Sequence, residues 1–208
     1  MPLRSKKDLE IILSKLQNFK KPSWELEQYA TPGDIAAEWV WSMAIKKEVQ
    51  GKVILDAACG PGIIGIGLLL LGASKVFFVD KDEKVMKICK QNYAAIKREY
   101  EIGPAVFIVQ DIAEFNEKVD IVVQNPPFGT KNKHIDKLFL EKAFSASPLI
   151  YSMHKLSTQS FVEAISRDHG FTITEVGEYD FPIKAAFTFH TKPVRKIEVG
   201  LWRMEKIK

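Results

Sequence analysis

The chain has few cysteines and no long apolar run. Cys59 and Cys89 are its only cysteines in 208 residues, too few for the disulfide framework of a small secreted protein, and a reducing, cytoplasmic setting fits best. No apolar run approaches the roughly 20 residues that span a bilayer. The first residues also lack the apolar core of a secretory signal. We therefore expect neither a membrane segment nor a secreted protein.

Neither sign of charge dominates. Lysine and arginine number 30 against 26 acidic residues, a net charge of +4. Such a mildly basic balance permits a nucleic-acid partner without requiring one. No set of cysteines and histidines has the spacing of metal ligands, so no metal site is expected. We find no repeat, low-complexity segment or linker, and expect one domain over residues 1–208.

Strand-like and helix-like segments alternate from residue 53 onward. Unbroken apolar strands between helices predict a mostly parallel sheet covered on both faces, an α/β fold. Residues 1–47 are expected to form an N-terminal helical extension, with helices at 6–18 and 33–47. The predicted strands are 53–56, 75–80, 105–109, 119–124, 148–152, and two near 171–178 and 195–203; the predicted helices are 62–71, 82–98, 135–145 and 158–168.

A glycine-rich loop follows the first predicted strand. Gly60, Gly62 and Gly65 match G-x-G-x-x-G, the pattern of dinucleotide sites. However, Asp56 precedes the loop, where the pyrophosphate of NAD would meet a carboxylate. The ammonium and sulfonium of S-adenosylmethionine (SAM) are compatible with an acid there. The loop therefore favours SAM over NAD.

Polar residues also end the next strands, where ligands bind in parallel sheets. Gly60 and Gly62, beside Cys59, let the backbone approach the cofactor closely. Asp80 is expected to accept hydrogen bonds from the ribose hydroxyls. Asp111 is expected to accept from the adenine amino group, with Ile112 packing on the ring. Each acid alone has another interpretation, as a helix N-cap or a turn residue.

Asn125, Pro126, Pro127 and Phe128 follow an apolar strand-like run. Two prolines fix the backbone and remove two N–H donors, so the local carbonyls point in set directions. The Asn125 amide oxygen adds an acceptor, and Phe128 offers a flat face for a planar substrate. This arrangement predicts methylation of an exocyclic amine or an amide; the alternative is a proline-rich turn that ends a strand.

With these residues placed, the chain closely resembles the archaeal and eukaryotic methyltransferase-like family of SAM-dependent adenine-N6 methyltransferases that act on small-subunit ribosomal RNA. The resemblance implies a Rossmann-like class I methyltransferase fold. It also implies that Gln28 and Thr31 reach the cofactor, although Gln28 alone reads equally well as part of a solvated turn. The segments that carry the resemblance are 26–32, 56–62, 125–130, 151–155 and 189–192.

Basic residues near the predicted active edge suggest an RNA partner. Lys131, Lys133 and Lys192 are expected to meet phosphates, and His154 and Lys155 end the fifth strand on the side of Asn125. The resemblance further implies a small zinc-binding activator, paired with an edge strand at 105–109. Three other functions remain open: protein-glutamine N5 methylation, DNA adenine-N6 methylation, and a SAM-binding scaffold without activity.

Overall fold

The computed structural model describes residues 3, 5–20, 22–23, 25–128, 135–184 and 194–207. Helices and strands alternate over most of this range. The helices are α1 (Lys6–Ser14), α2 (Gly33–Ile45), α3 (Ile63–Leu70), α4 (Glu83–Glu99), α5 (Ile135–Ala146) and α6 (Gln159–Asp168), with 3-10 turns η1 (Ile112–Glu114) and η2 (Leu156–Thr158). The strands are β1 (Val53–Ala57), β2 (Lys75–Asp80), β3 (Ala105–Val109), β4 (Ile121–Gln124), β5 (Leu149–Lys155), β6 (Phe171–Lys184) and β7 (Val194–Lys206).

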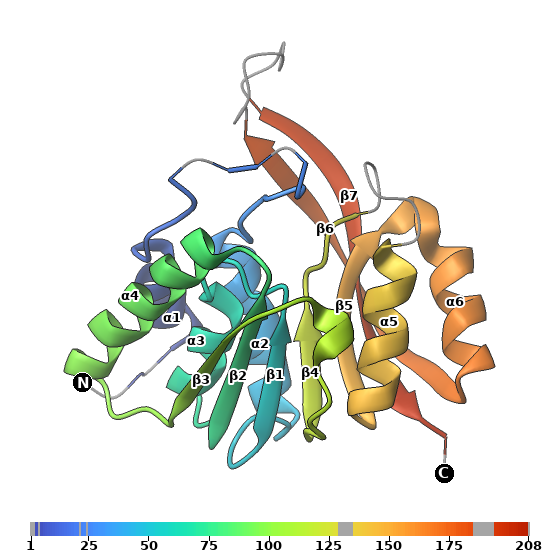
Figure 1. Ribbon diagram of the computed structural model, residues 1–208, viewed down its shortest axis with the longest axis horizontal. Coiled ribbons are helices and arrows are strands. Elements are labelled where there is room, and N and C mark those ends of the chain that lie inside the picture. The colour runs from blue at the N-terminus through green and yellow to red at the C-terminus, as the bar shows by residue number, and fades with distance from the viewer. Residues whose placement is uncertain are drawn as a thin grey trace.

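The strands form one seven-stranded sheet in the order β3-β2-β1-β4-β5-β7-β6. The first five strands pair in parallel, whereas β7 runs antiparallel to both β5 and β6. Figure 1 shows helices on both faces of this sheet. The predicted mostly parallel α/β sheet covered on both faces is confirmed.

Alternation along the central strands divides the core into two layers. Ile54 and Val123 are fully buried against the side of α1 to α4. Their neighbours Leu55 and Val122 are fully buried against α5 and α6. Since successive side chains of a strand point to opposite faces, unbroken apolar strands such as these can serve both layers. Within the described ranges, no helix is both long and apolar enough to cross a membrane.

The last two strands are longer than the sequence predicts. Instead of 171–178 and 195–203, β6 and β7 cover Phe171–Lys184 and Val194–Lys206. In Figure 1 their arms extend beyond the other strands. Pro182 suggests a strand end, but β6 pairs only with β7 at the sheet edge, where a proline is tolerated.

The first helix is shorter than predicted, ending at Ser14 instead of residue 18. Asn92 of α4 explains the early end. Its Oδ1 accepts a hydrogen bond from the Gln17 N–H over 2.9 Å, and its Nδ2 donates to the carbonyls of Gln17 and Pro61, also over 2.9 Å. This buried amide therefore ties the chain after α1 to the glycine-rich loop.

Candidate active site

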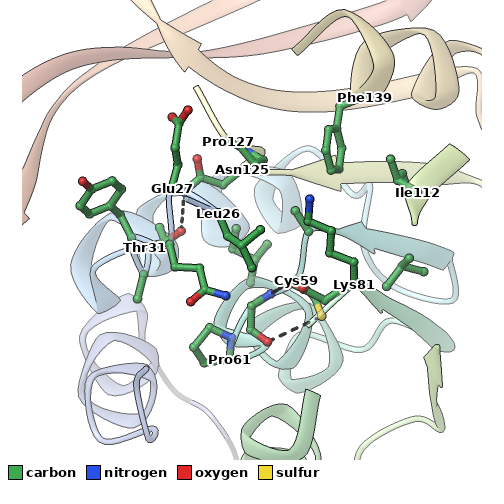
Figure 2. A pocket seen from close by; sticks show the side chains of 18 of the residues that line it. Leu26, Glu27, Thr31, Cys59, Pro61, Lys81, Ile112, Asn125, Pro127 and Phe139 are labelled. Carbon is green, nitrogen blue, oxygen red and sulfur yellow. Dashed lines mark hydrogen bonds between the residues drawn. The ribbon is translucent and has the colours of Figure 1, made fainter. Parts of the chain in front are cut away.

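An open pocket lies at the carboxyl ends of the parallel strands, the place where ligands bind in open α/β sheets. Three parts of the chain that are far apart in sequence form its wall, as Figure 2 shows. These are the segment before α2, the loops after β1, β2 and β3, and a third part made of Asn125 and Pro127 after β4 with two residues of α5. The wall includes Glu27, Gln28, Thr31, Cys59, Gly60, Asp80, Asp111, Ile112, Asn125, Pro127 and Phe139.

Asp80 and the glycine-rich loop are hydrogen-bonded to each other. Asp80 Oδ2 accepts from the Gly60 N–H over 2.9 Å, and Oδ1 accepts from the Asp82 N–H over 2.9 Å. Each oxygen keeps a lone pair that can accept a further donor. Burial raises the pKa of Asp80, an effect opposed by these backbone bonds. The carboxylate is thus held in place with capacity for the two hydroxyls of a ribose.

The two glycines serve different purposes. Gly60 lines the pocket with φ of 53°, a left-handed conformation that favours glycine. Gly62 has φ of 83° and is not part of the wall. A Cβ there would lie 2.5 Å from Cys89 Sγ, so Gly62 allows the loop to pack on α4. Cys59 lines the pocket and is nearly buried.

Asp56 lies beneath the loop, outside the pocket wall. Its side chain is 1% exposed, and Oδ2 accepts a hydrogen bond from the Gly65 N–H over 2.9 Å. Burial raises its pKa to about 8. In this geometry the carboxyl stabilises the first turn of α3, and the expected role of Asp56 toward the positively charged cofactor stays a prediction.

Asp111 and Ile112 form the far side of the pocket. Asp111 Oδ1 accepts from the Ala113 N–H over 2.9 Å and caps η1, so the N-cap interpretation of this acid applies although it also lines the pocket. Ile112 is 5% exposed. In Figure 2 it lies on the same side as Phe139, and together they offer an apolar surface to a planar ring.

The amide of Asn125 has one bonded end and one free end. Its Nδ2 donates to Thr31 Oγ1 over 3.0 Å. Its Oδ1 is buried and finds no hydrogen-bond partner in the part of the chain that the structure describes. Pro127 lines the pocket beside it, whereas Pro126 is buried. Buried unpaired acceptors are rare, so the Asn125 oxygen is a candidate to receive a ligand donor.

Phe128 lies next to this amide but outside the pocket wall. Its ring packs edge-on against Phe181 of β6, with centroids 6.2 Å apart. Lys155 Nζ lies 6.0 Å from the ring centroid of Phe128. An aromatic ring beside a cation suits a base and its phosphate.

His154 does not have the position expected of a substrate contact. It is 2% exposed, and its Nε2 lies 2.6 Å from Ser152 Oγ. Burial lowers the pKa of His154 to about 3. Its ring also packs edge-on against Trp202. The sequence places His154 near the strand end, but alternation turns its side chain into the core. The other expected substrate contacts, Lys131, Lys133 and Lys192, fall outside the described residues.

Glu27 and Phe139 are among the wall residues that were not anticipated from the sequence. Glu27 is 9% exposed and has φ of 49°, a conformation that is uncommon for residues other than glycine and concentrates at functional sites. Phe139 enters the wall from α5, and its apolar spacing in that helix predicts only a core position. Across the described ranges, no group of three or more acidic, histidine or cysteine side chains is placed to hold a metal ion.

Known proteins are similar to this chain over most of its length. The family model described as Conserved hypothetical protein 95 matches residues 34–175. The uncharacterized protein MJ0284 of Methanocaldococcus jannaschii is 33% identical, over 97% of this chain and 94% of its own length. The Drosophila melanogaster rRNA N(6)-adenosine-methyltransferase Mettl5 is also 33% identical, over 95% of this chain and 94% of its own.

Solved structures agree with the fold. The crystal structure of PH1948 from Pyrococcus horikoshii, provisionally described as an RNA methyltransferase, has a TM-score of 0.91 and 38% identity and covers 99% of this chain and 100% of its own. Magnesium protoporphyrin IX methyltransferase from Synechocystis, at 19% identity, TM-score 0.65 and coverage of 82% and 77%, shows the fold alone. The chain therefore belongs to the Conserved hypothetical protein 95 family and has the fold of the class I methyltransferases.

Proposed function

We propose that this protein transfers a methyl group from SAM to the exocyclic N6 amine of an adenosine in RNA, most specifically in small-subunit ribosomal RNA. The observation that carries the proposal is the buried Oδ1 of Asn125, a residue of the pocket wall, which has no hydrogen-bond partner among the described residues. An exocyclic amine offers N–H donors to such an acceptor. The names of relatives that align over nearly the whole chain support RNA and adenine as the substrate.

The pocket residues fit SAM. Asp80 has free lone pairs for the ribose hydroxyls, the Gly60 backbone lies in the wall, and Ile112 with Phe139 presents an apolar surface for adenine. When bound, SAM supplies a methyl group on a sulfonium. Asp56, with its pKa raised to about 8, accepts a hydrogen bond from the Gly65 N–H and does not line the pocket. Asp80 and Asp111 are acidic residues of the wall.

In this proposal Asn125 activates the amine by orientation. The nitrogen of adenine N6 is a poor nucleophile because its lone pair is delocalised into the ring. If Asn125 Oδ1 and the Pro126 carbonyl each accept one N–H, the nitrogen becomes more tetrahedral and its lone pair turns toward the methyl group. Catalysis then rests on orientation and preorganised acceptors, and the proton leaves after the transfer.

Phe128 supplies the surface on which the target base stacks. Base–aromatic stacking contributes about 1–3 kcal/mol in single-strand binders. Phe181 supports this ring from β6, and Lys155 places a cation near it. A paired base must leave its helix before it reaches Phe128, so the target is expected in a loop or a weak pair. Lys131, Lys133 and Lys192 remain proposed phosphate contacts.

Methylation of different substrates by the purified protein tests the proposal. Total ribosomal RNA, each ribosomal subunit's RNA, DNA and glutamine-containing release-factor-like protein are incubated with labelled SAM, and digested nucleosides are separated by mass spectrometry. We expect N6-methyladenosine from small-subunit RNA. Label confined to protein would establish the glutamine reaction instead, and label in DNA the DNA reaction. Absence of transfer to all of them would leave the scaffold function.

We also propose that a partner chain adds a strand to β3. This strand forms one end of the sheet, and Val106 and Val109 are 36% and 45% exposed. An edge strand with exposed apolar side chains and no charge invites pairing with another chain. The resemblance described above points to a small zinc-binding activator as the partner, and the uncharged edge of β3 supports such a contact.

A further inference from the structure

We propose that Thr31 is a positioning residue, whose hydroxyl holds the Asn125 amide so that Oδ1 faces the substrate amine. This inference rests on the proposed function and refines it. The resemblance assigns Thr31 to the cofactor instead. The hydrogen bond from Asn125 Nδ2 to Thr31 Oγ1 spans 3.0 Å between residues 94 positions apart, and Figure 2 shows both side chains at the pocket wall.

In the described structure the Thr31 hydroxyl accepts from the nitrogen end of the Asn125 amide. With Nδ2 held by Thr31, the oxygen must occupy the opposite side, where it is buried without a partner among the described residues. Rotation of the amide by half a turn would present N–H donors to an amine that itself carries N–H donors. The orientation of the Asn125 amide therefore decides whether the substrate is bound or repelled.

Thr31 is well suited to this task because its backbone is held rigidly. Its side chain is 7% exposed. Pro32, the next residue, fixes its own φ and accepts the first hydrogen bond of α2, from the Ala36 N–H over 2.9 Å. Gly33 packs so closely on α1 that a Cβ would lie 2.3 Å from Ser14 Oγ. Functional side chains need to stay within about 0.5 Å of their productive geometry, and these contacts restrain the segment that carries Thr31.

Three variants separate positioning from cofactor binding. Thr31→Val keeps the shape and removes the hydroxyl, Thr31→Ser keeps the hydroxyl, and Thr174→Val removes an exposed threonine of β6 as the control. We expect Thr31→Val to lower kcat about tenfold, equivalent to ~1.4 kcal/mol, and to change the calorimetric Kd for S-adenosylhomocysteine less than about twofold. Thr31→Ser should restore most of kcat. A loss of cofactor affinity that accounts for the whole defect would overturn the inference.

A double-mutant cycle gives a second readout. If Thr31 acts through Asn125, then Thr31→Val should cause no further loss of kcat in an Asn125→Ala background. Additive losses would show that Thr31 acts by another route, and the inference would fall. The calorimetric stoichiometry of S-adenosylhomocysteine binding gives the fraction of folded protein in each preparation. The kcat of each variant is then calculated per folded molecule, so a loss of folded protein is not mistaken for a loss of orientation.

A crystal structure of Thr31→Val with S-adenosylhomocysteine tests the geometry without any activity. We expect the Asn125 amide to turn away from its wild-type orientation. An amide that stays in place, together with an unchanged kcat, would refute the positioning role even though RNA methylation stands. Conversely, wild-type protein that does not methylate RNA would refute the proposed function. The orientation of the Asn125 amide in crystal structures of the wild-type protein and of Thr31→Val would still decide the role of Thr31.

Discussion

Gln28 and Asp82 join the segment before α2 to the start of α4. The Gln28 Nε2 group donates to Asp82 Oδ2 over 2.8 Å, while Gln28 Oε1 accepts from the Ser23 N–H over 2.7 Å. Asp82 meanwhile caps α4 by accepting from the Lys84 N–H with its other oxygen. Gln28 lies in the pocket wall, so this contact holds one side of the pocket against the other.

An exchange of donor and acceptor tests this contact. Asp82→Asn retains an oxygen for the helix cap but places an N–H donor opposite the Gln28 donor, and we expect the Kd for S-adenosylhomocysteine to rise about tenfold. Gln28→Glu alone places two carboxylates together and should weaken binding similarly. The double variant restores one donor and one acceptor. Calorimetry should therefore show recovery in the double variant, and continued weak binding there would contradict the role of this pair.

Removal of the Asn125 amide should abolish turnover while sparing the cofactor. Asn125→Ala deletes the acceptor that is buried and unpaired in the described structure. Because this acceptor acts on the amine in the transition state, we expect methyl transfer to fall at least about a hundredfold. Binding of S-adenosylhomocysteine should stay within about threefold of wild type. Asn116→Ala, at an exposed position, is the control, and near-normal turnover of the Asn125 variant would remove the basis of the proposed mechanism.

His154 should make the protein sensitive to acid. Its pKa is lowered by burial from 6.5 to about 3, so the unfolded chain takes up a proton before the folded one as pH falls. The stability that neutral His154 contributes is complete above pH 6.5 and is lost progressively down to pH 3. Linkage between protonation and folding lowers the free energy of unfolding by about 2 kcal/mol at pH 5, relative to its value at neutral pH.

Urea unfolding at several pH values measures this effect. We expect the wild-type midpoint to fall more steeply between pH 7 and pH 5 than the midpoint of His154→Gln, which keeps a polar group near Ser152 but cannot gain a proton. The difference between the urea midpoints of the wild type and His154→Gln at pH 7 serves as the baseline. Parallel curves would show that His154 takes up a proton in the folded state without penalty.

Charges on β3 should prevent the addition of a partner strand. Val106→Lys with Val109→Lys alters two exposed side chains of this edge, whereas Ile108 packs partly against the core and is left unchanged. We expect the double variant to lose co-purification of a small zinc-binding protein, measured by zinc content and mass of the complex. Val176→Lys, 40% exposed on the opposite edge strand, should retain it. A complex that survives both charges on β3 places the contact elsewhere.

Strand ends could be predicted from the sequence because apolar runs and the polar residues after them are local patterns. Asp80 ends a predicted strand, Asp111 and Asn125 come after predicted strands, and all three line the pocket. Contacts between distant segments leave no such pattern. Nothing local shows that Thr31 bonds to Asn125 or that Gln28 bonds to Asp82.

Side-chain direction near a strand end is also hard to predict. Asp56 and His154 are polar and close to the expected active edge, yet both are nearly fully buried. A strand residue turns toward the core or the pocket according to the exact register and twist of its neighbours, which the sequence alone does not define. Bonds to Gly65 and Ser152 stabilise these two side chains inside the protein.

The position of β1 between β2 and β4 has a consequence for protein synthesis. A nascent chain that has emerged only as far as β3 can pair β1 with β2, but the opposite edge of β1 has no partner until Ile121–Gln124 follows. A product cut short before Ile121 thus contains Gly60 and Asp80 and still presents bare N–H and C=O groups along Val53–Ala57. Such an edge promotes aggregation, so premature termination in this region is expected to yield insoluble chains rather than inactive ones.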